Sequence, residues 1–293
     1  PYFFKRTNIK VQNRSVLAAM TNKQSYPNGI ISKKEIDWLV ERAKGGFGII
    51  TTAATNISIE SKGWKGEFGV YDDIHIPNLN KLTSAIHNYD SLIFAQLFHG
   101  GIRSPQKLTG VVPLSASELK CIESQTGKCR SASENDINAI IKDFTSAAVR
   151  CVQSGFDGIE LHGAHGYLIS QFLGTKTNLR KDKWGQNLEG RSRLLTQICK
   201  SIKQNVPESF IIGVRLSPEL SSIGINLNDT INLIGILKKQ DIDFIHLSCW
   251  DVFASSKTST QKNNTLTEII TSSYSKLPTI ISTGGVWSKL DAQ

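Results

Sequence analysis

The feature that most constrains this chain is a sevenfold alternation of short apolar runs with longer amphipathic patterns. The apolar runs are bounded by glycine or polar residues, as is typical of strands buried on both faces; they cover 16–20, 48–52, 92–97, 158–161, 211–216, 244–248 and 279–284. The intervening patterns predict helices over 34–43, 76–88, 134–154, 189–205, 228–239 and 265–276. We expect Ser131 to cap the helix that begins at Glu134.

Seven successive βα units predict an α/β protein with a parallel sheet and right-handed crossovers. An open dinucleotide-binding sheet needs a GxGxxG motif after its first strand, and residues 21–23 are Thr-Asn-Lys instead. We therefore predict a TIM (β/α)₈ barrel, whose active-site residues lie where the strands end. Residues 290–292 are expected to begin a helix, and no eighth strand follows them. The expectation is one barrel domain over 1–293, C-terminally truncated and without its eighth βα unit.

Composition narrows the classes of partner. The 34 Lys and Arg against 25 Asp and Glu give a net charge of +9, but the basic residues are scattered and form no RNA-binding tract. No run approaches the ~18 apolar residues of a membrane span. We therefore expect neither a nucleic-acid nor a membrane partner, and leave a homo-oligomer open. The cysteines form no CxxC pair, which favours a cytoplasmic location; they are Cys121, Cys129, Cys151, Cys199 and Cys249.

The strongest chemical signal is the run from His162 through His165 to Tyr167, at the end of the fourth predicted strand. A metal pair is one interpretation, although no third ligand falls at a familiar spacing. Two structural histidines are another. In a third, the histidines donate hydrogen bonds to a developing oxyanion and the tyrosine supplies a proton. Three donors within six residues at a strand end favour this catalytic interpretation.

The segment 162–168, followed by 171–173 and 178–182, resembles the old yellow enzyme family of FMN-dependent NAD(P)H:flavin oxidoreductases and ene reductases, which fold as TIM barrels. Further matches follow the family's order; they cover 13–21, 42–48, 96–103, 213–217 and 283–286. Six ordered matches in one chain are specific, whereas any one alone is not. The resemblance implies FMN as the cofactor and NADH or NADPH as the reductant.

The resemblance also implies which residues bind FMN: Ala19, Met20, Thr21, Ala53, Gln96, Arg215, Gly284 and Gly285. Gln96 would hydrogen-bond the pyrimidine ring. Arg215 would place positive charge beside N1 and O2, where a reduced flavin needs a counter-charge. Gly284 and Gly285 would offer backbone N–H groups to the phosphate.

For the substrate, the resemblance implies that His162 and His165 hold a carbonyl oxygen and that Tyr167 protonates the α-carbon. Lys23, which stands where several relatives carry an aromatic residue, and Trp250 would border the substrate. The implied substrate is a small enone or quinone-like molecule. Because the reductant and the substrate would use one face of the flavin in turn, the implied kinetics are ping-pong.

Three other functions stay open. A tRNA-dihydrouridine synthase needs a cysteine acid and an RNA-binding extension, whereas Tyr167 holds the donor position here. A degenerate, non-catalytic barrel would explain the missing eighth unit, but the retained polar residues argue against it. In the third alternative, the chain is the barrel part of a longer enzyme resembling dienoyl-CoA reductase or trimethylamine dehydrogenase, whose iron–sulfur cysteine cluster follows the barrel.

Overall fold

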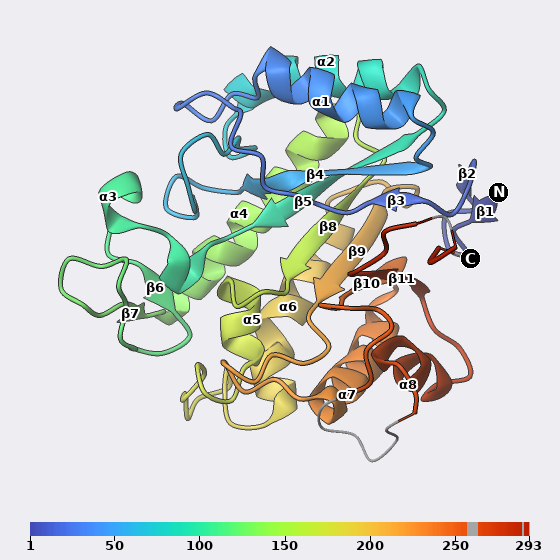
Figure 1. Ribbon diagram of the computed structural model, residues 1–293. Helices are drawn as coiled ribbons and strands as arrows, with labels where there is room; N and C mark the ends of the chain where they lie inside the picture. The colour runs from blue at the N-terminus through green and yellow to red at the C-terminus, as the bar shows by residue number, and fades with distance from the viewer. Residues whose placement is uncertain (257–262, 289, 293) are drawn as a thin grey trace.

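The computed structural model describes residues 1–256, 263–288 and 290–292. Its centre is a seven-stranded sheet in the order β11-β10-β9-β8-β5-β4-β3, in which all neighbours are parallel (Figure 1). The strands are β3 (Val16–Leu17), β4 (Ile49–Asn56), β5 (Leu92–Phe98), β8 (Gly158–Gly163), β9 (Ile211–Leu216), β10 (Phe244–Ser248) and β11 (Thr279–Thr283). The predicted order of seven parallel strands is confirmed.

Six longer helices surround the sheet on its outer side (Figure 1). They are α1 (Lys33–Lys44), α2 (Ile76–His87), α4 (Glu134–Gln153), α6 (Leu188–Lys203), α7 (Leu227–Leu237) and α8 (Leu266–Ser272). Each buries one apolar stripe against the strands, as the 3.6-residue period requires; in α4 the stripe includes Ile137, Phe144 and Cys151. Among the described residues, no helix is both long and apolar enough to cross a membrane.

The start of α4 differs from the prediction. Ser133, not Ser131, is the N-cap, and it forms a capping box with Asp136. Ser131 belongs to β7 (Arg130–Ser131), which pairs with β6 (Leu114–Ser115), and its hydroxyl donates to the carbonyl of Ala116 at 3.1 Å. This pairing keeps the chain extended for two more residues, so the helix cap moves along by the same amount.

Several element boundaries also differ. Strand β3 is shorter than predicted and, among the described residues, pairs only with β4. Strand β4 continues to Asn56 through a bulge between Thr51 and Ala54. Helix α8 ends at Ser272 instead of 276. The predicted helix start at 290–292 is a turn in which the Asp291 carboxylate accepts from the backbone of Ser288.

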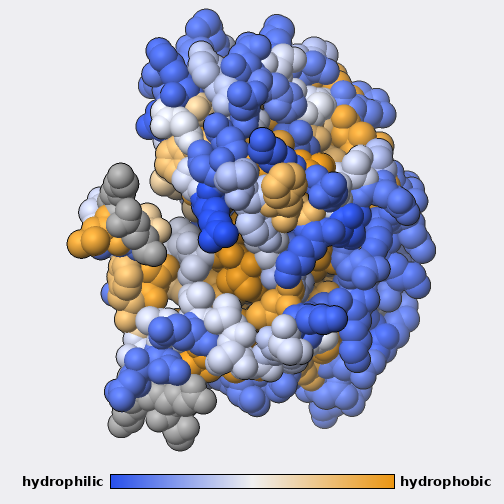
Figure 2. Space-filling view, turned by 90° about the vertical axis from the view of Figure 1, so that its right-hand side faces the viewer, coloured by the Kyte–Doolittle hydropathy of each residue, from blue (hydrophilic) through white to orange (hydrophobic). Residues whose placement is uncertain are grey.

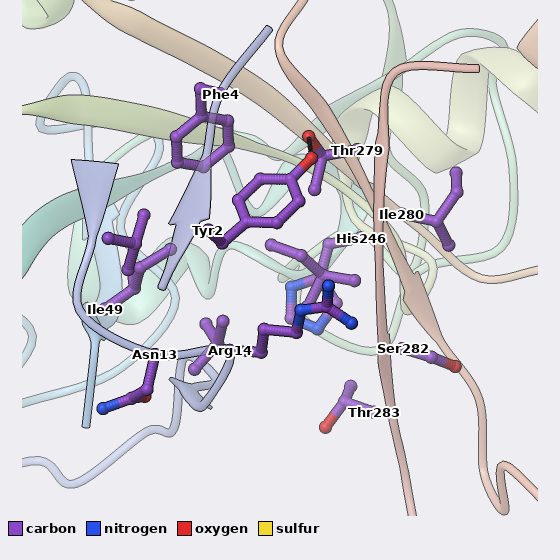
Figure 3. Close-up of a pocket in the computed structure, with 13 residues that line it drawn as sticks. Tyr2, Phe4, Asn13, Arg14, Ile49, His246, Thr279, Ile280, Ser282 and Thr283 are labelled. Carbon is purple, nitrogen blue, oxygen red and sulfur yellow. Dashed lines mark hydrogen bonds between the residues drawn. The ribbon is translucent and has the colours of Figure 1, made fainter. Parts of the chain in front are cut away.

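The barrel is open between β3 and β11, because no eighth strand joins these two edges among the described residues. A cavity of about 350 Å³ lies at this seam, bordered by residues of both edges and by Tyr2, Arg14 and His246 (Figure 3). The surface on this side of the molecule is hollowed, and apolar side chains show at its floor (Figure 2). The predicted barrel class is therefore confirmed, with one unit fewer than a closed barrel has.

The N-terminal hairpin closes the bottom of the barrel. It consists of β1 (Tyr2–Phe3) and β2 (Lys10–Val11). Phe4 follows β1 and packs against the stacked rings of Phe94 and Phe244, with 6.2 Å between ring centroids in each case. Because aromatic side chains fill the lower end, a ligand can reach the interior from the carboxyl ends of the strands.

Candidate active site

The three predicted donors meet at the carboxyl end of β8. His162 is within the strand, His165 lies in the following turn, and Tyr167 is the N-cap residue of α5 (Leu168–Leu173). The ring centroid of His162 lies 5.0 Å from that of His165 and 4.8 Å from that of Tyr167, and both contacts are edge-on. The structure therefore brings two imidazoles and a phenol into one cluster.

His162 is a neutral hydrogen-bond donor. The backbone N–H of Ala164 donates to its Nδ1 at 3.3 Å, so the ring proton belongs on Nε2. Burial, and after it the nearby His165 and Arg215, lower the pKa of His162 well below 6.5. At neutral pH the ring therefore offers Nε2–H to a ligand and carries no charge.

His165 is held by its backbone in a left-handed conformation with φ 60°. Its N–H donates to Ser217 Oγ at 3.1 Å, and its carbonyl accepts from Arg103 Nη1 at 2.9 Å. Its Nε2 lies 2.7 Å from Ser248 Oγ. Burial and the cations Arg215 and Arg103 lower the pKa of His165 to about 4, so this imidazole is also neutral at pH 7.

Tyr167 is packed by its ring and keeps its proton. The ring stands edge-on to Phe98 at 4.6 Å between centroids, and the guanidinium carbon of Arg103 lies 4.4 Å above it. Burial raises the pKa of Tyr167 above 10, and Arg103 offsets only part of this rise. A group that must donate a proton at neutral pH needs this protonation state.

Arg215, at the end of β9, supplies a buried positive charge. Its Nη1 donates to the carbonyl of Ala19 at 3.2 Å and its Nη2 to Ser248 Oγ at 3.1 Å. Its Nε is buried without a hydrogen-bond partner among the described residues. Such an unpaired N–H is costly and fits an anionic or carbonyl-bearing edge of a ring, which is what FMN would present.

The turn after β11 fits the phosphate end of the same cofactor. Gly284 and Gly285 have φ values of 133° and 69°, which other residues adopt only with strain. A Cβ on Gly284 would come 2.2 Å from the carbonyl oxygen of Cys249, so a side chain has no room there. Two consecutive glycines with positive φ at a strand end are suited to close approach by an anion.

The remaining predicted residues lie in different surroundings. Ala53 and Gln96 are buried inside the barrel, whereas Met20 and Thr21 lie exposed beyond the end of β3. The Gln96 amide donates to Glu160 Oε1 at 2.6 Å. The predicted roles of all four in FMN binding stay predictions.

The two predicted substrate neighbours are not part of the cluster of rings. Lys23 is exposed in a left-handed turn with φ 55°, and its backbone lies against Gly66. Trp250 is fully exposed and borders a surface hollow with Gly285 and Trp287. Contact between a substrate and either side chain stays a prediction.

Sequence reasoning gave no site role to Ser217, Ser248, Glu160 or His246, and it left open whether the segment 100–103, with Arg103, encloses a ligand or only turns the chain. Arg103 and the two serines lie at or beyond the carboxyl ends of β5, β9 and β10, which is a detectable position in a barrel. Glu160 and His246 interrupt apolar strands, and a polar residue in such a strand signals a buried pair. No three His, Cys, Asp or Glu side chains of the described residues are grouped to hold a metal ion.

Comparison with known proteins gives consistent matches. Residues 3–291 match the model of the NADH:flavin oxidoreductase / NADH oxidase family. A probable NADH-dependent flavin oxidoreductase of Bacillus subtilis is 32% identical over 299 residues, covering 100% of this chain and 79% of that protein. An NADH:acrylate oxidoreductase of Vibrio harveyi is 30% identical over 298 residues, covering 98% of this chain and 30% of that protein. An old yellow enzyme homologue of Zymomonas mobilis superposes with a TM-score of 0.84 at 26% identity, covering 98% of this chain and 83% of that one.

The fold and the site together define a flavin-dependent oxidoreductase built on a TIM barrel. The chain belongs to the NADH:flavin oxidoreductase / NADH oxidase family, which is the old yellow enzyme family. Its cofactor is FMN and its reductant is NADH or NADPH. The predictions of family, enzyme class and cofactor are confirmed. The Vibrio relative is much longer, and the chain spans 30% of its length.

Proposed function

We propose that the protein reduces the activated carbon–carbon double bond of an α,β-unsaturated carbonyl compound, with NADH or NADPH as the electron source. The observation that carries this proposal is the cluster of His162, His165 and Tyr167, in which two neutral imidazoles and a protonated phenol lie beside a buried guanidinium. The name of the Vibrio relative supports it, because acrylate is itself an α,β-unsaturated carboxylate.

Arg215 and the glycines after β11 would hold FMN, which would supply a hydride for the β-carbon of the substrate. His162 donates its Nε2–H to the carbonyl oxygen of the substrate. Ser248 Oγ accepts from Arg215, so its own proton can point to His165 Nε2, which leaves the ring proton of His165 on Nδ1 as the second donor. Preorganised donors aimed at the oxygen stabilise the negative charge that develops there, and one such donor contributes about 10²–10³-fold in rate.

Tyr167 then donates its phenolic proton to the α-carbon. Arg103 lies over the ring of Tyr167 and also binds the carbonyl of His165, so it orients the acid relative to an oxyanion donor. NAD(P)H and the substrate would bind in turn at the same place, the carboxyl end of the barrel strands, which gives ping-pong kinetics. We infer a small-molecule substrate on this basis.

The experiment that tests the proposal is an anaerobic visible spectrum of the purified chain with FMN. The flavin band should bleach on addition of NADH or NADPH and return on addition of 2-cyclohexenone. The variant Tyr167→Phe is the control, because it should bleach normally and recover slowly with the enone. A chain that binds FMN and is bleached, but is not reoxidised by any enone, would exclude ene reduction while leaving the flavin chemistry intact.

A second candidate is a barrel that forms one part of a longer flavoenzyme. The observation that favours it is the length of the Vibrio relative, of which this chain covers 30%. This candidate would be supported if NAD(P)H did not reduce the flavin of the isolated chain and another added electron donor did.

A further inference from the structure

A chain of three buried polar side chains crosses the interior of the barrel below the cluster of rings. Gln96 of β5, Glu160 of β8 and His246 of β10 are 2%, 1% and 0% exposed. Gln96 Nε2 donates to Glu160 Oε1 at 2.6 Å, and His246 Nδ1 lies 2.6 Å from Glu160 Oε2. An ionisable group in such a place is unfavourable unless it is paired, and the mechanism described above makes no use of Glu160 or His246.

Glu160 is the acceptor at the centre of this chain. Burial by itself would raise its pKa, but His246, and after it Arg215 and Gln96, bring the pKa below its ordinary value. The side chain is therefore a carboxylate, which has no proton to donate. Both of its oxygens are occupied, one by Gln96 and one by His246.

A carboxylate neighbour fixes the orientation of an amide. Of the two ends of the Gln96 side chain, only the NH₂ group can bind Glu160, so the carbonyl oxygen of Gln96 must face another direction. One N–H of the amide also remains for another acceptor. The pyrimidine ring of a flavin presents an N–H between two carbonyl groups, and an amide in this orientation complements that pattern.

These three polar side chains also lie next to Arg215, the cation of the site. Strand β9 places Arg215 in register with His162 on one side and with His246 on the other. Gln96 and Glu160 pair one step lower, level with Gly213, and the charge of Arg215 still acts on Glu160, whose pKa it lowers. The other ring nitrogen of His246 has no partner among the described residues, and His246 lines the seam cavity (Figure 3).

We propose that Glu160 and His246 are positioning residues for the cofactor: Glu160 turns the Gln96 amide so that its carbonyl oxygen faces the flavin, and His246 holds Glu160 in place. The inference rests on the FMN site of the proposed function. It concerns residues that do not themselves touch the reacting atoms.

The principal variant is Glu160→Gln, which keeps the size of the side chain. A glutamine at this position can offer its own NH₂ group to Gln96, so the amide of Gln96 is no longer held in one orientation. We expect the dissociation constant of FMN to rise about tenfold, as for one hydrogen bond in a buried site. We also expect the nuclear magnetic resonance signal of ¹⁵N-labelled flavin N3 to shift, because this nitrogen loses its fixed acceptor.

Two substitutions of His246 separate hydrogen bonding from packing. His246→Asn keeps a donor near the position of Nδ1 and should bind FMN within about twofold of the wild type, whereas His246→Leu should lose about tenfold. His75→Leu is the matched control, because His75 is also buried but lies against Tyr71, away from the site. Its FMN affinity should equal that of the wild type.

The dissociation constant is measured by titrating FMN into each flavin-free protein and following the loss of flavin fluorescence. A thermal unfolding curve shows that each variant is folded. Because Glu160 acts through Gln96, Glu160→Gln should add nothing in a Gln96→Leu background. Wild-type affinity and an unshifted N3 signal in Glu160→Gln would overturn the proposal, as would additive losses in the double variant. If His246→Leu does not fold, Glu160→Gln and His246→Asn still decide. Failure of the wild-type chain to bind FMN would instead overturn the proposed function.

Discussion

Replacing Tyr167 by phenylalanine removes one oxygen atom and keeps every packing contact of the ring. Phe98, His162 and Arg103 all touch the ring, at 4.6, 4.8 and 4.4 Å, and a phenyl group can preserve these contacts. The hydroxyl has no hydrogen bond to the described residues, so its removal leaves no buried partner unsatisfied. We therefore expect the free energy of unfolding to change by less than about 1 kcal/mol.

The kinetic effect should be confined to one half-reaction. A positioned general acid contributes about 10²–10⁴-fold, which corresponds to about 3–5 kcal/mol of activation free energy. Only the reduction of an enone needs a proton on carbon, whereas a quinone takes its protons on oxygen. Because burial holds the pKa of Tyr167 above 10, wild-type enone reduction should also be independent of pH between about 6 and 9.

Stopped-flow absorbance under anaerobic conditions measures both half-reactions. In Tyr167→Phe, bleaching of the flavin by NADH should keep its wild-type rate within about twofold, and reoxidation by a quinone should do the same. Reoxidation by 2-cyclohexenone should slow by about 10²–10⁴-fold. Equal losses in both half-reactions would show that Tyr167 supports the flavin site and is not the proton donor. Unchanged enone reduction would assign the proton to another group.

Three further predictions concern charge and hydrogen bonding. His162→Ala removes the Nε2–H donor and should slow enone reduction by about 10²–10³-fold; unchanged turnover in a steady-state assay would remove His162 from the site. Arg215→Met removes the buried cation and should make the flavin midpoint potential more negative, as spectroelectrochemistry measures; an equal midpoint would contradict the assignment. Burial lowers the pKa of His75 to about 4 and that of His99 to about 3, so each takes up a proton on unfolding below pH 6.5. The free energy of unfolding should therefore fall by about 1.4 kcal/mol per pH unit per histidine as the pH drops from 6.5 toward 4; equal urea midpoints at pH 7 and pH 5 would refute this.

The fold could be predicted where local pattern and tertiary environment agree. Strands β9 and β10 lie between two neighbours each, and their predicted limits of 211–216 and 244–248 match the structure. Strand β3 ends after Leu17 because, in the part of the chain that the structure describes, it pairs on one side only. Its apolar sequence does not contain this information. The cap of α4 is Ser133 because β7 pairs with a segment sixteen residues earlier, and this pairing is not visible in the local pattern.

The same distinction applies to the site. His162, His165 and Tyr167 lie within six residues, so one turn of the chain determines the geometry of their cluster. The motif alone therefore predicts that these three side chains lie together. The contact of Ser248 with both His165 and Arg215 joins three strands, and it depends on how far each strand is staggered against the next. Sequence identifies Ser248 as the last residue of a strand but cannot give that stagger.

Polar residues inside strands carry information of a third kind, since their burial predicts a partner without naming it. Glu160 and His246 are 86 positions apart, and the register pairs Glu160 with Gly213 and Gly213 with Phe244, two residues before His246. They meet because tilted barrel strands are staggered, which brings a residue of β10 level with one of β8 across β9. The register pairs Arg215 with His162 on one side and with His246 on the other. Arg215 therefore lies between the donors for the substrate and the residues that orient Gln96. We expect substitutions of Glu160 or His246 to weaken flavin binding before they change proton donation by Tyr167.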